Sequence, residues 1–438
     1  MASNKLGKND ILAAFFDEGS YTALFADGAV NAAFGCTGGQ PAYAVCQCGE
    51  AVAAKDVEKI VTILEMAAKT GNPVVTFYDS VGAKLEEGLD ILAANTKLAS
   101  AIAKISGVVP QVAVVLGVCG GSAALAAASA DVCVMAEDAE LFFTAPVNSA
   151  VAGDEVEGAG SAALAAKAGV ATIVAEDAIA EAAKLVALLP ANNLAGPALF
   201  DAEAPKAAFP AQYKAADAAA ALADEGSLVE LYAAFGENVY TALGTVNGSA
   251  VGIAATEPAG LCHSCVSKLA RFVRLCDAFS IPVVTVVNSE GFIPSVSDDV
   301  AGGIREAARL TATYADATTA KVAVVAGKAA GPVYTALCNA DVVIAMEKGV
   351  IAPVDPTVAV TVLYKDEIDA APSIPAATQA KAAAYAKDVC GAQAAIEVGL
   401  ATFAADAASV RGLLVAGLDM MANKRVQRLP KKHGDMAL

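Results

Sequence analysis

The sequence predicts an α/β protein of two tandem domains that are related by internal duplication. The segment VAVVLGVCGGSAALAAASAD, Val112–Asp131, recurs 210 residues later as VAVVAGKAAGPVYTALCNAD, Val322–Asp341. Two shorter segments recur in the same order and at nearly the same offset: DEGS at 17–20 and 224–227, and PVVT at 73–76 and 282–285. Because order and spacing are both kept, the chain consists of two homologous halves, each long enough to form a domain of its own.

The elements of the first half follow from apolar periodicity and from turn residues. A helical pattern over 51–70 ends at a Gly-Asn-Pro turn, and this turn precedes a strand at 74–78. A glycine turn at 79–84 and a helical stretch at 85–106 lead to the duplicated segment, and strand residues return at 130–143. This alternation indicates an α/β spiral whose turns gather at one edge, where ligands of such folds bind.

The second half repeats this course, with a helix at 266–279, a strand at 283–287 and a turn at 288–292. The helix places Lys268, Arg271 and Arg274 at helical spacing, which predicts a solvated basic face. The predicted division of the chain is an N-terminal domain at 1–205, an ordered linker at 206–223, a C-terminal domain at 224–404 and a helical, basic tail at 405–438. In so acidic a chain, the tail is expected to contact an acidic surface of another subunit.

Composition excludes several classes of function. A formal charge of −18 over 438 residues argues against nucleic acid or an anionic membrane as the main partner. The mean hydropathy of +0.54 resembles that of a membrane protein, and no charge interrupts the chain from Val112 to Ala130. That run consists mainly of small residues and has a turn at its centre, so we expect a buried core instead of a membrane span. The first residues carry no secretory pattern, and a cytoplasmic location is expected.

Ten cysteines are scattered without a disulfide-like framework, which is typical of reduced, buried thiols. The tightest cluster is Cys262-His263-Ser264-Cys265. A zinc site needs a matching pair of ligands elsewhere, and the sequence has none, so no metal site is predicted. Packing of a loop is favoured for this cluster over metal or redox use.

The duplicated segment is also the first candidate site. A helix that opens directly after a glycine turn points its unpaired N–H groups and its positive dipole end toward the strand tip. Gly120, Gly121 and Ser122 are therefore candidates for holding an anion or a developing oxyanion. The alternative is a turn that needs small residues only for packing. Its recurrence at Gly331 favours the functional interpretation.

Longer segments resemble one known family. They include KTGNPVV at 69–75, SGVVPQVAVVLG at 106–117, LPANN at 189–193 and KLARFVRLCDAFSIPVVTVVNSEGFIP at 268–294. These segments resemble the carboxyltransferase subunits of biotin-dependent enzymes, which include the β chains of acyl-CoA carboxylases and the α subunits of methylmalonyl-CoA and glutaconyl-CoA decarboxylases. The resemblance implies a crotonase-like (ββα spiral) fold for each half, with an acyl-CoA side in the first and a biotin side in the second.

The resemblance also implies site residues. Its oxyanion turns correspond to the catalytic residues Gly121 and Ser122 in the first half and Gly331 and Val333 in the second. Its substrate-binding positions correspond to Gly82, Ala83, Lys84, Gly120, Gly291 and Phe292. Since Pro332 has no N–H, the second turn is expected to keep one backbone donor, whereas Gly121 and Ser122 are expected to keep both. Val81 and Ser295 are further departures from the glycines of the family.

The implied reaction moves a carboxyl group between biotin and a small acyl-CoA of the malonyl-, methylmalonyl- or glutaconyl-CoA type, through an enolate held by backbone N–H groups. Biotin is expected on a separate carrier protein, since the chain has no Ala-Met-Lys-Met attachment motif. Other implied partners are a membrane decarboxylase subunit and further copies of the chain, from a dimer to a hexamer. Two alternatives stay open: a catalytically degenerate scaffold subunit, and a crotonase-like hydratase or hydrolase.

Overall fold

The structure is a computed structural model that describes residues 6–151, 153, 157–427 and 429–435 of the chain. Residues 1–5, 152 and 154–156 of the predicted N-terminal domain, and residues 428 and 436–438 of the predicted tail, lie outside the described residues. The chain forms two compact units. The first contains the chain up to Ala198 with two short later segments, Leu231–Phe235 and Ala278–Ser280, and the second contains the remainder.

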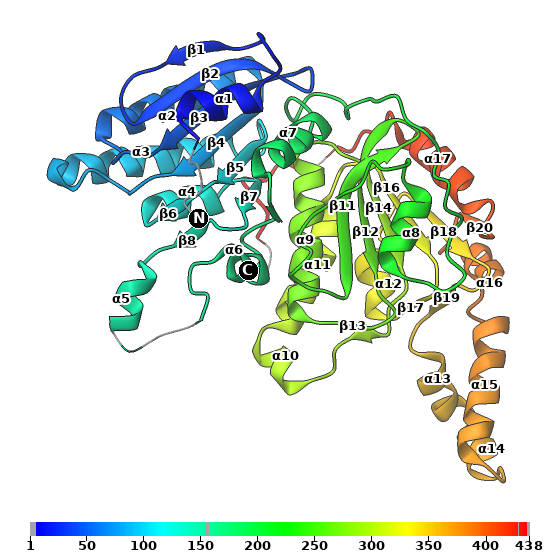
Figure 1. Cartoon of the computed structure of the whole chain (residues 1–438). Helices are drawn as coiled ribbons and strands as arrows, with labels where there is room; N and C mark the ends of the chain where they lie inside the picture. The colour runs from blue at the N-terminus through cyan, green and yellow to red at the C-terminus, as the bar shows by residue number, and fades with distance from the viewer. Residues whose placement is uncertain (1–5, 152, 154–156, 428, 436–438) are drawn as a thin grey trace. The chain divides into compact units, whose positions relative to one another are not determined.

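The first unit is built on a seven-stranded mixed sheet (Figure 1). Its order is β1 (Thr22–Phe25), β2 (Val30–Thr37), β3 (Gln40–Cys48), β4 (Val74–Asp79), β5 (Gln111–Val115), β7 (Val132–Ala136) and β9 (Ile173–Ala175). The first three strands pair antiparallel and the others parallel. A two-stranded sheet of β6 (Val118–Gly120) and β8 (Glu140–Phe142) accompanies it.

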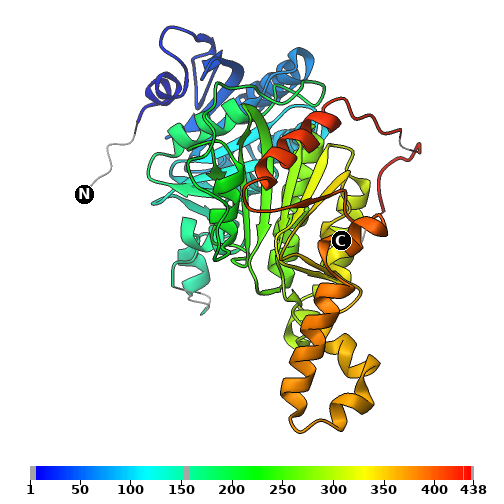
Figure 2. The same ribbon diagram turned by 90° about the vertical axis from the view of Figure 1, so that its right-hand side faces the viewer.

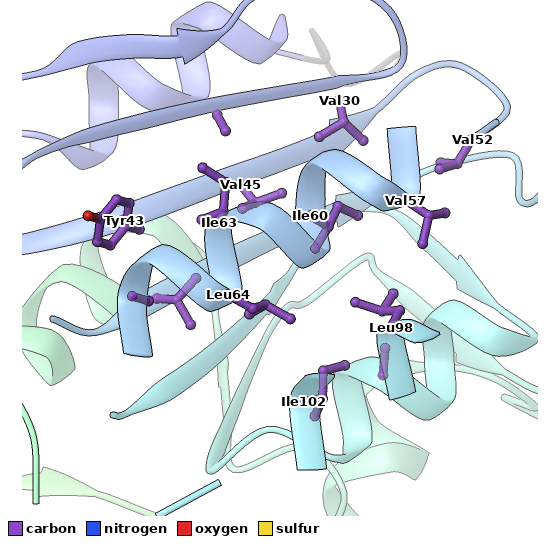
Figure 3. Close-up of a cluster of buried hydrophobic side chains, with 14 of the residues drawn as sticks. Val30, Tyr43, Val45, Val52, Val57, Ile60, Ile63, Leu64, Leu98 and Ile102 are labelled. Atoms are coloured by element: carbon purple, nitrogen blue, oxygen red, sulfur yellow. The ribbon is translucent and has the colours of Figure 1, made fainter. Parts of the chain in front are cut away.

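Helices cover both faces of this sheet. The helices of this unit are α1 (Lys8–Phe15), α2 (Ala54–Thr70), the 3₁₀ helix η1 (Leu85–Glu87), α3 (Leu89–Ile105), α4 (Ser122–Ala128), α5 (Pro146–Val151), α6 (Ala162–Lys167) and α7 (Ala178–Leu188). On one face, Tyr43 and Val45 of β3 join Ile63 of α2 and Leu98 of α3 in one buried cluster (Figure 3). The side chain of Phe77 of β4 lies on the other face of the sheet and contacts Phe15 of α1, with ring centroids 5.4 Å apart.

The second unit repeats the same sheet. Its order is β10 (Val229–Glu230), β11 (Val239–Val246), β12 (Ser249–Thr256), β14 (Val283–Val287), β16 (Lys321–Val325), β18 (Val342–Met346) and β20 (Phe403–Ala405). Two short sheets accompany it, β13 (Gly260–Leu261) with β15 (Gly291–Phe292) and β17 (Lys328–Ala330) with β19 (Val350–Ala352). Because strand order and strand directions match those of the first unit, the predicted duplication of an α/β fold is confirmed.

The helices of the second unit are α8 (Ala215–Leu222), α9 (His263–Ala278), α10 (Val296–Val300), α11 (Gly303–Asp316), α12 (Pro332–Leu337), α13 (Pro356–Leu363), α14 (Lys365–Asp369), α15 (Ile374–Asp388), α16 (Ala392–Glu397) and α17 (Val410–Met421). Figure 2 shows α13, α14 and α15 extending beyond the sheet of this unit. These helices share a small core of their own, formed around Val360, Ile368 and Ala382.

The repeated DEGS segment closes a hairpin in each unit. The carboxylate of Asp17 accepts hydrogen bonds from the N–H groups of Gly38 and Gly39, both at 2.9 Å. Asp224 accepts from Asn247 at 3.0 Å and from Gly248 at 2.8 Å in the same way. A carboxylate that holds two backbone donors fixes the β2–β3 and β11–β12 turns, so this repeat has a structural role.

Three features differ from the sequence expectations. Residues 206–223 belong to the second unit instead of forming a linker, because α8 buries Ala215 and Leu222 in that unit's core. Within the predicted tail, Lys424 binds Asp341 of its own chain at 2.8 Å, and α17 packs on β16 and β18. Lys268 is not solvated: only 1% of it is exposed, and its Nζ donates to the carbonyl of Val239.

The alanine-rich stretch that raises the mean hydropathy forms β5, β6 and α4. Within the part of the chain that the structure describes, no helix is both long and apolar enough to cross a membrane.

Candidate functional site

The glycine turn of the first unit joins β6 to α4. Gly121 stands just before the helix with φ +61°, a backbone conformation that favours glycine. Its N–H donates to the carbonyl of Phe142 at 2.9 Å. Ser122 is the first helical residue, so its N–H has no acceptor within the helix. The expectation that both residues keep an open donor is therefore wrong for Gly121, and Ser122 is the donor of this turn.

A second loop follows β4. The buried hydroxyl of Ser80 donates to the carbonyl of Glu50 at 2.9 Å and accepts from the N–H of Gly82 at 3.1 Å. The N–H of Lys84 donates to the carbonyl of Val52 at 2.9 Å. Between them, the N–H of Ala83 has no hydrogen-bond acceptor among the residues that the structure describes. The loop is thus fixed on both sides of one open donor.

The two loops line one cavity of about 290 Å³. It brings together five of the residues predicted from sequence, namely Gly82, Ala83, Gly120, Gly121 and Ser122. Lys84 is not part of its lining, and the residue is exposed. Most of the other walls are apolar and come from β6, β8, α2, α3, α4 and the strand–helix connections: Val52, Val57, Ile60, Val81, Ile91, Leu98, Val118, Ala126 and Phe142.

Sequence reasoning missed the polar side chains of this cavity. Gln47 lies at the end of β3, is 5% exposed and lines the cavity, as does Asn95 of α3. Neither amide makes a side-chain hydrogen bond within the described part of the chain. Gln47 lies between two cysteines in the strand. This pattern predicts a buried strand and does not indicate a site.

The carboxylate that ends β4 holds the start of β6, the strand that leads into the glycine turn. The Oδ1 atom of Asp79 accepts from the N–H of Val118 at 3.0 Å. Gly117 lies so close that a Cβ added there would be 2.1 Å from this oxygen. Asn288 and Gly327 repeat the arrangement in the second unit, where Asn288 Oδ1 accepts from a backbone N–H at 3.1 Å. This contact explains why the duplicated segment keeps its first glycine.

The corresponding turn of the second unit joins β17 to α12. Gly331 has φ +52° and donates its N–H to the carbonyl of Ala352 at 2.8 Å. The expectation that Gly331 keeps an open donor is therefore wrong. Pro332 is the first helical residue and has no N–H, which leaves Val333 as the first helical donor. Its side chain is buried, with 1% exposed.

The other two predicted residues of this unit, Gly291 and Phe292, form β15, and α12 packs against that strand. Ser289 Oγ accepts from the N–H of Gly291 at 3.2 Å, as Ser80 does for Gly82 in the first unit. The four predicted residues of the second unit therefore lie on two elements that pack together, β15 and the start of α12, with the same loop support.

A charge cluster beside this second turn was not predicted. Lys328 of β17 contacts Glu290 and lies 2.8 Å from Asp355. Burial by itself lowers the pKa of Lys328, but its hydrogen bonds to Asp355 and Glu290 outweigh burial and raise the pKa above its ordinary value. Lys328 therefore stays charged in this cluster.

Comparisons with known proteins agree with this geometry. A family profile described as the carboxyl transferase domain matches residues 12–436. The chain is 33% identical over 441 residues to the methylmalonyl-CoA carboxyltransferase 12S subunit of Propionibacterium freudenreichii subsp. shermanii, which covers 94% of this chain and 84% of that protein. It is 30% identical over 487 residues to the methylmalonyl-CoA decarboxylase subunit alpha of Propionigenium modestum, covering 100% and 94%.

Among solved structures, the chain is similar to a transcarboxylase 12S crystal structure with methylmalonyl-coenzyme A and methylmalonic acid bound. The TM-score is 0.92 at 31% sequence identity, and the match covers 99% of this chain and 92% of that one. That structure is described as a hexamer assembly with substrate binding to a multienzyme core.

Proposed function

Because the chain belongs to the carboxyl transferase domain family, whose members include biotin-dependent acyl-CoA carboxyltransferases, we propose that it moves a carboxyl group between a small acyl-CoA and biotin on a separate carrier protein. The observation that carries this proposal is the cavity of the first unit. It combines apolar walls with two open backbone donors, the N–H groups of Ala83 and Ser122. Such donors stabilise an oxyanion without a side-chain acid or base.

In this proposal the first unit binds the acyl thioester. The N–H groups of Ala83 and Ser122 hold the thioester oxygen as it gains negative charge in the enolate. When bound, the carboxylated biotin of the carrier would supply the carboxyl group to the α-carbon of that enolate, and its ureido nitrogen, which keeps the electron pair of the broken C–N bond, would take up the proton that the α-carbon loses. The positive end of α4 stabilises the enolate further. Gly120 and Gly121 position the turn, and Gly121 does so through its hydrogen bond to Phe142.

The second unit is proposed to bind biotin at the α12–β15 contact. The N–H of Val333 lies in the first turn of α12, and the acyl side also has its donor in the first turn of a helix. Gly291 and Phe292 form the strand that packs against α12. One backbone donor fewer in the first position of the helix implies a weaker oxyanion site on this side than on the acyl side. The Lys328 cluster lies beside it and stays outside the proposed reaction.

The cavity suits a small acyl group. Its volume is about 290 Å³, and its mostly aliphatic lining has room for the acyl part of such a thioester. The solved relative is described with methylmalonyl-coenzyme A bound and as a hexamer. We propose that this chain takes a substrate of the malonyl-, methylmalonyl- or glutaconyl-CoA type, and that it acts as a homo-oligomer with a biotin carboxyl carrier protein and, in a decarboxylase complex, a membrane subunit.

The test is a transfer assay with the full chain. Each of malonyl-, methylmalonyl- and glutaconyl-CoA, labelled in its free carboxyl group, is incubated with a biotinylated carrier domain and, separately, with free biotin. We expect label to move from one acyl-CoA to biotin, and no movement with an unbiotinylated carrier. If none of the three substrates transfers label, the proposal is wrong.

A second candidate, the degenerate scaffold subunit, is favoured by Pro332, which removes one donor from the second turn. It predicts stable binding to a biotin carrier or to a related carboxyltransferase without turnover. Robust transfer by the isolated chain excludes it. Binding without transfer supports it over catalysis.

A further inference from the structure

Two cysteines lie together at the start of α9. Cys262 immediately precedes the helix and Cys265 lies in its first turn, with their Sγ atoms 3.1 Å apart. The N–H of Cys265 donates to Cys262 Sγ at 3.4 Å. Cys262 is half-buried, whereas Cys265 is 1% exposed. A thiol that solvent reaches and a buried thiol are thus already in contact.

The first unit shows that the fold does not need this pair. At the corresponding positions it has Ala53 and Asp56, and the Asp56 carboxylate accepts from the N–H of Ala53 at 3.4 Å at the start of α2. In the second unit another residue supplies a similar contact, because Asp298 Oδ1 accepts from the N–H of His263 at 2.9 Å. The same helix start therefore forms without cysteines, and the second unit has a different cap.

The two thiols have different surroundings, which predict different roles for them. Cys262 lies at the N-terminus of a helix of 16 residues, and its Sγ accepts an N–H group from the first turn of that helix. Burial, followed by the hydrogen bond to Cys262, raises the pKa of Cys265 to about 12. The accessible sulfur is therefore the attacking group and the buried sulfur the resolving one.

We propose that Cys262 and Cys265 form a reversible dithiol–disulfide site that reacts with small-molecule disulfides. The thiolate of Cys262 attacks one sulfur of the external disulfide, and the other sulfur leaves as a thiol. The sulfur of Cys265, as it loses its proton, then attacks Cys262 and releases the second external thiol. The chain loses two electrons and two protons, and the external disulfide gains both.

The position of this site links it to the second unit's turn. Cys262 follows β13 directly, and Leu261 of β13 pairs with Phe292 of β15. A disulfide would therefore tie the start of α9 next to the strand that carries Gly291 and Phe292. The proposed chemistry itself does not depend on carboxyl transfer, and its test does not measure transfer.

The chain contains two internal controls. Cys46 and Cys48 of β3 also have their Sγ atoms 3.2 Å apart, but both residues are buried. Cys36 is half-buried, like Cys262, and no second cysteine contacts it among the residues that the structure describes. Proximity alone predicts that the β3 pair oxidises, and exposure alone predicts that Cys36 and Cys262 react in the same way.

The experiment equilibrates the full, folded chain anaerobically in mixtures of reduced and oxidised glutathione, followed by an alkylating quench and peptide mass spectrometry. We expect the Cys262–Cys265 peptide to lose two hydrogen masses in a single two-electron transition, and the reduced thiols to return when reduced glutathione is in excess. Cys36 is expected to take up glutathione as a mixed disulfide, and the β3 pair to stay reduced. A Cys262 that ends only as a glutathione adduct, or that stays reduced in excess oxidised glutathione, overturns the proposal.

Two variants separate the steps. Cys265→Ser is expected to accumulate the mixed disulfide at Cys262, at least about tenfold more than the wild type, because the resolving thiol is gone. Cys262→Ala copies Ala53 of the first unit, so it should fold, and it is expected to leave Cys265 unmodified. If Cys265 is glutathionylated at the wild-type rate in folded Cys262→Ala, the assignment of the attacking sulfur is wrong.

Discussion

Replacing Ser122 with proline tests the proposed acyl-side donors most directly. The variant removes one N–H from the turn, and the second unit already carries a proline at the corresponding position, Pro332. Gly331 precedes that proline with φ +52°, close to the +61° of Gly121. Proline is well tolerated at the first helical position because that N–H has no helical partner. Ser122→Pro is therefore expected to fold normally.

The magnitude follows from the number of donors. The cavity has two open backbone donors, and the variant removes one. Loss of one oxyanion donor typically costs about 3 kcal/mol of barrier, which corresponds to a decrease in kcat of roughly 10²- to 10³-fold. Ser122→Ala is the matched control, because it keeps the N–H and removes only an exposed hydroxyl. Its kcat is expected to stay within about threefold of the wild type.

The assay is carboxyl transfer from the acyl-CoA that proves active, measured at saturating substrate, with circular dichroism and thermal unfolding to establish that each variant is folded. A folded Ser122→Pro protein with wild-type kcat would refute the assignment of this donor. Equal losses in the proline and alanine variants would instead move the role to the hydroxyl group.

Three further predictions concern stability. Asp17→Ala is expected to lower the free energy of unfolding by about 1 to 3 kcal/mol. Asp224→Ala is expected to lower it by about 3 to 5 kcal/mol, since this variant also leaves a salt-bridge partner unpaired. If urea unfolding gives the reverse order, the two hairpin assignments are wrong. Burial lowers the pKa of Lys268 from its ordinary value of 10.5 to about 8. Between pH 8 and pH 10.5 the unfolded chain therefore binds more protons than the folded chain. The stability of the wild type relative to Lys268→Met is therefore expected to rise by about 3 kcal/mol as pH increases through that window, and a flat difference would mean that the lysine is not desolvated. Gly117→Ala places a Cβ 2.1 Å from Asp79 Oδ1 and is expected to cost about 1 to 3 kcal/mol in thermal unfolding, whereas an unchanged melting temperature would show that the carboxylate moves freely.

Part of the candidate site could be predicted because it depends on residue type at fixed spacing. Glycine with positive φ before a helix is required at Gly121 and Gly331 whatever surrounds them, so the turns were located correctly. Which N–H groups are open could not be predicted. The acceptors for the two glycines, Phe142 and Ala352, come from β8 and β19, and only the pairing of those short strands brings them into place.

Two errors have similar causes. Residues 206–223 read as a linker because alanine and proline give no strong periodic pattern, and the helix α8 is buried only because the second sheet covers it. Lys268 shares helical spacing with Arg271 and Arg274, but this spacing does not show which side of the helix is buried. The lysine lies on the buried side, where the carbonyl of Val239 accepts a hydrogen bond from its Nζ.

The duplication, the α/β class and the positions of the turns could be predicted from the sequence, because they depend on local patterns that both halves preserve. The open backbone donors of the cavity, the contact between the two cysteines and the burial of Lys268 are visible only in the folded chain. These properties depend on partners far away in the chain, and a hydrogen bond or a buried contact forms only when folding brings both partners together.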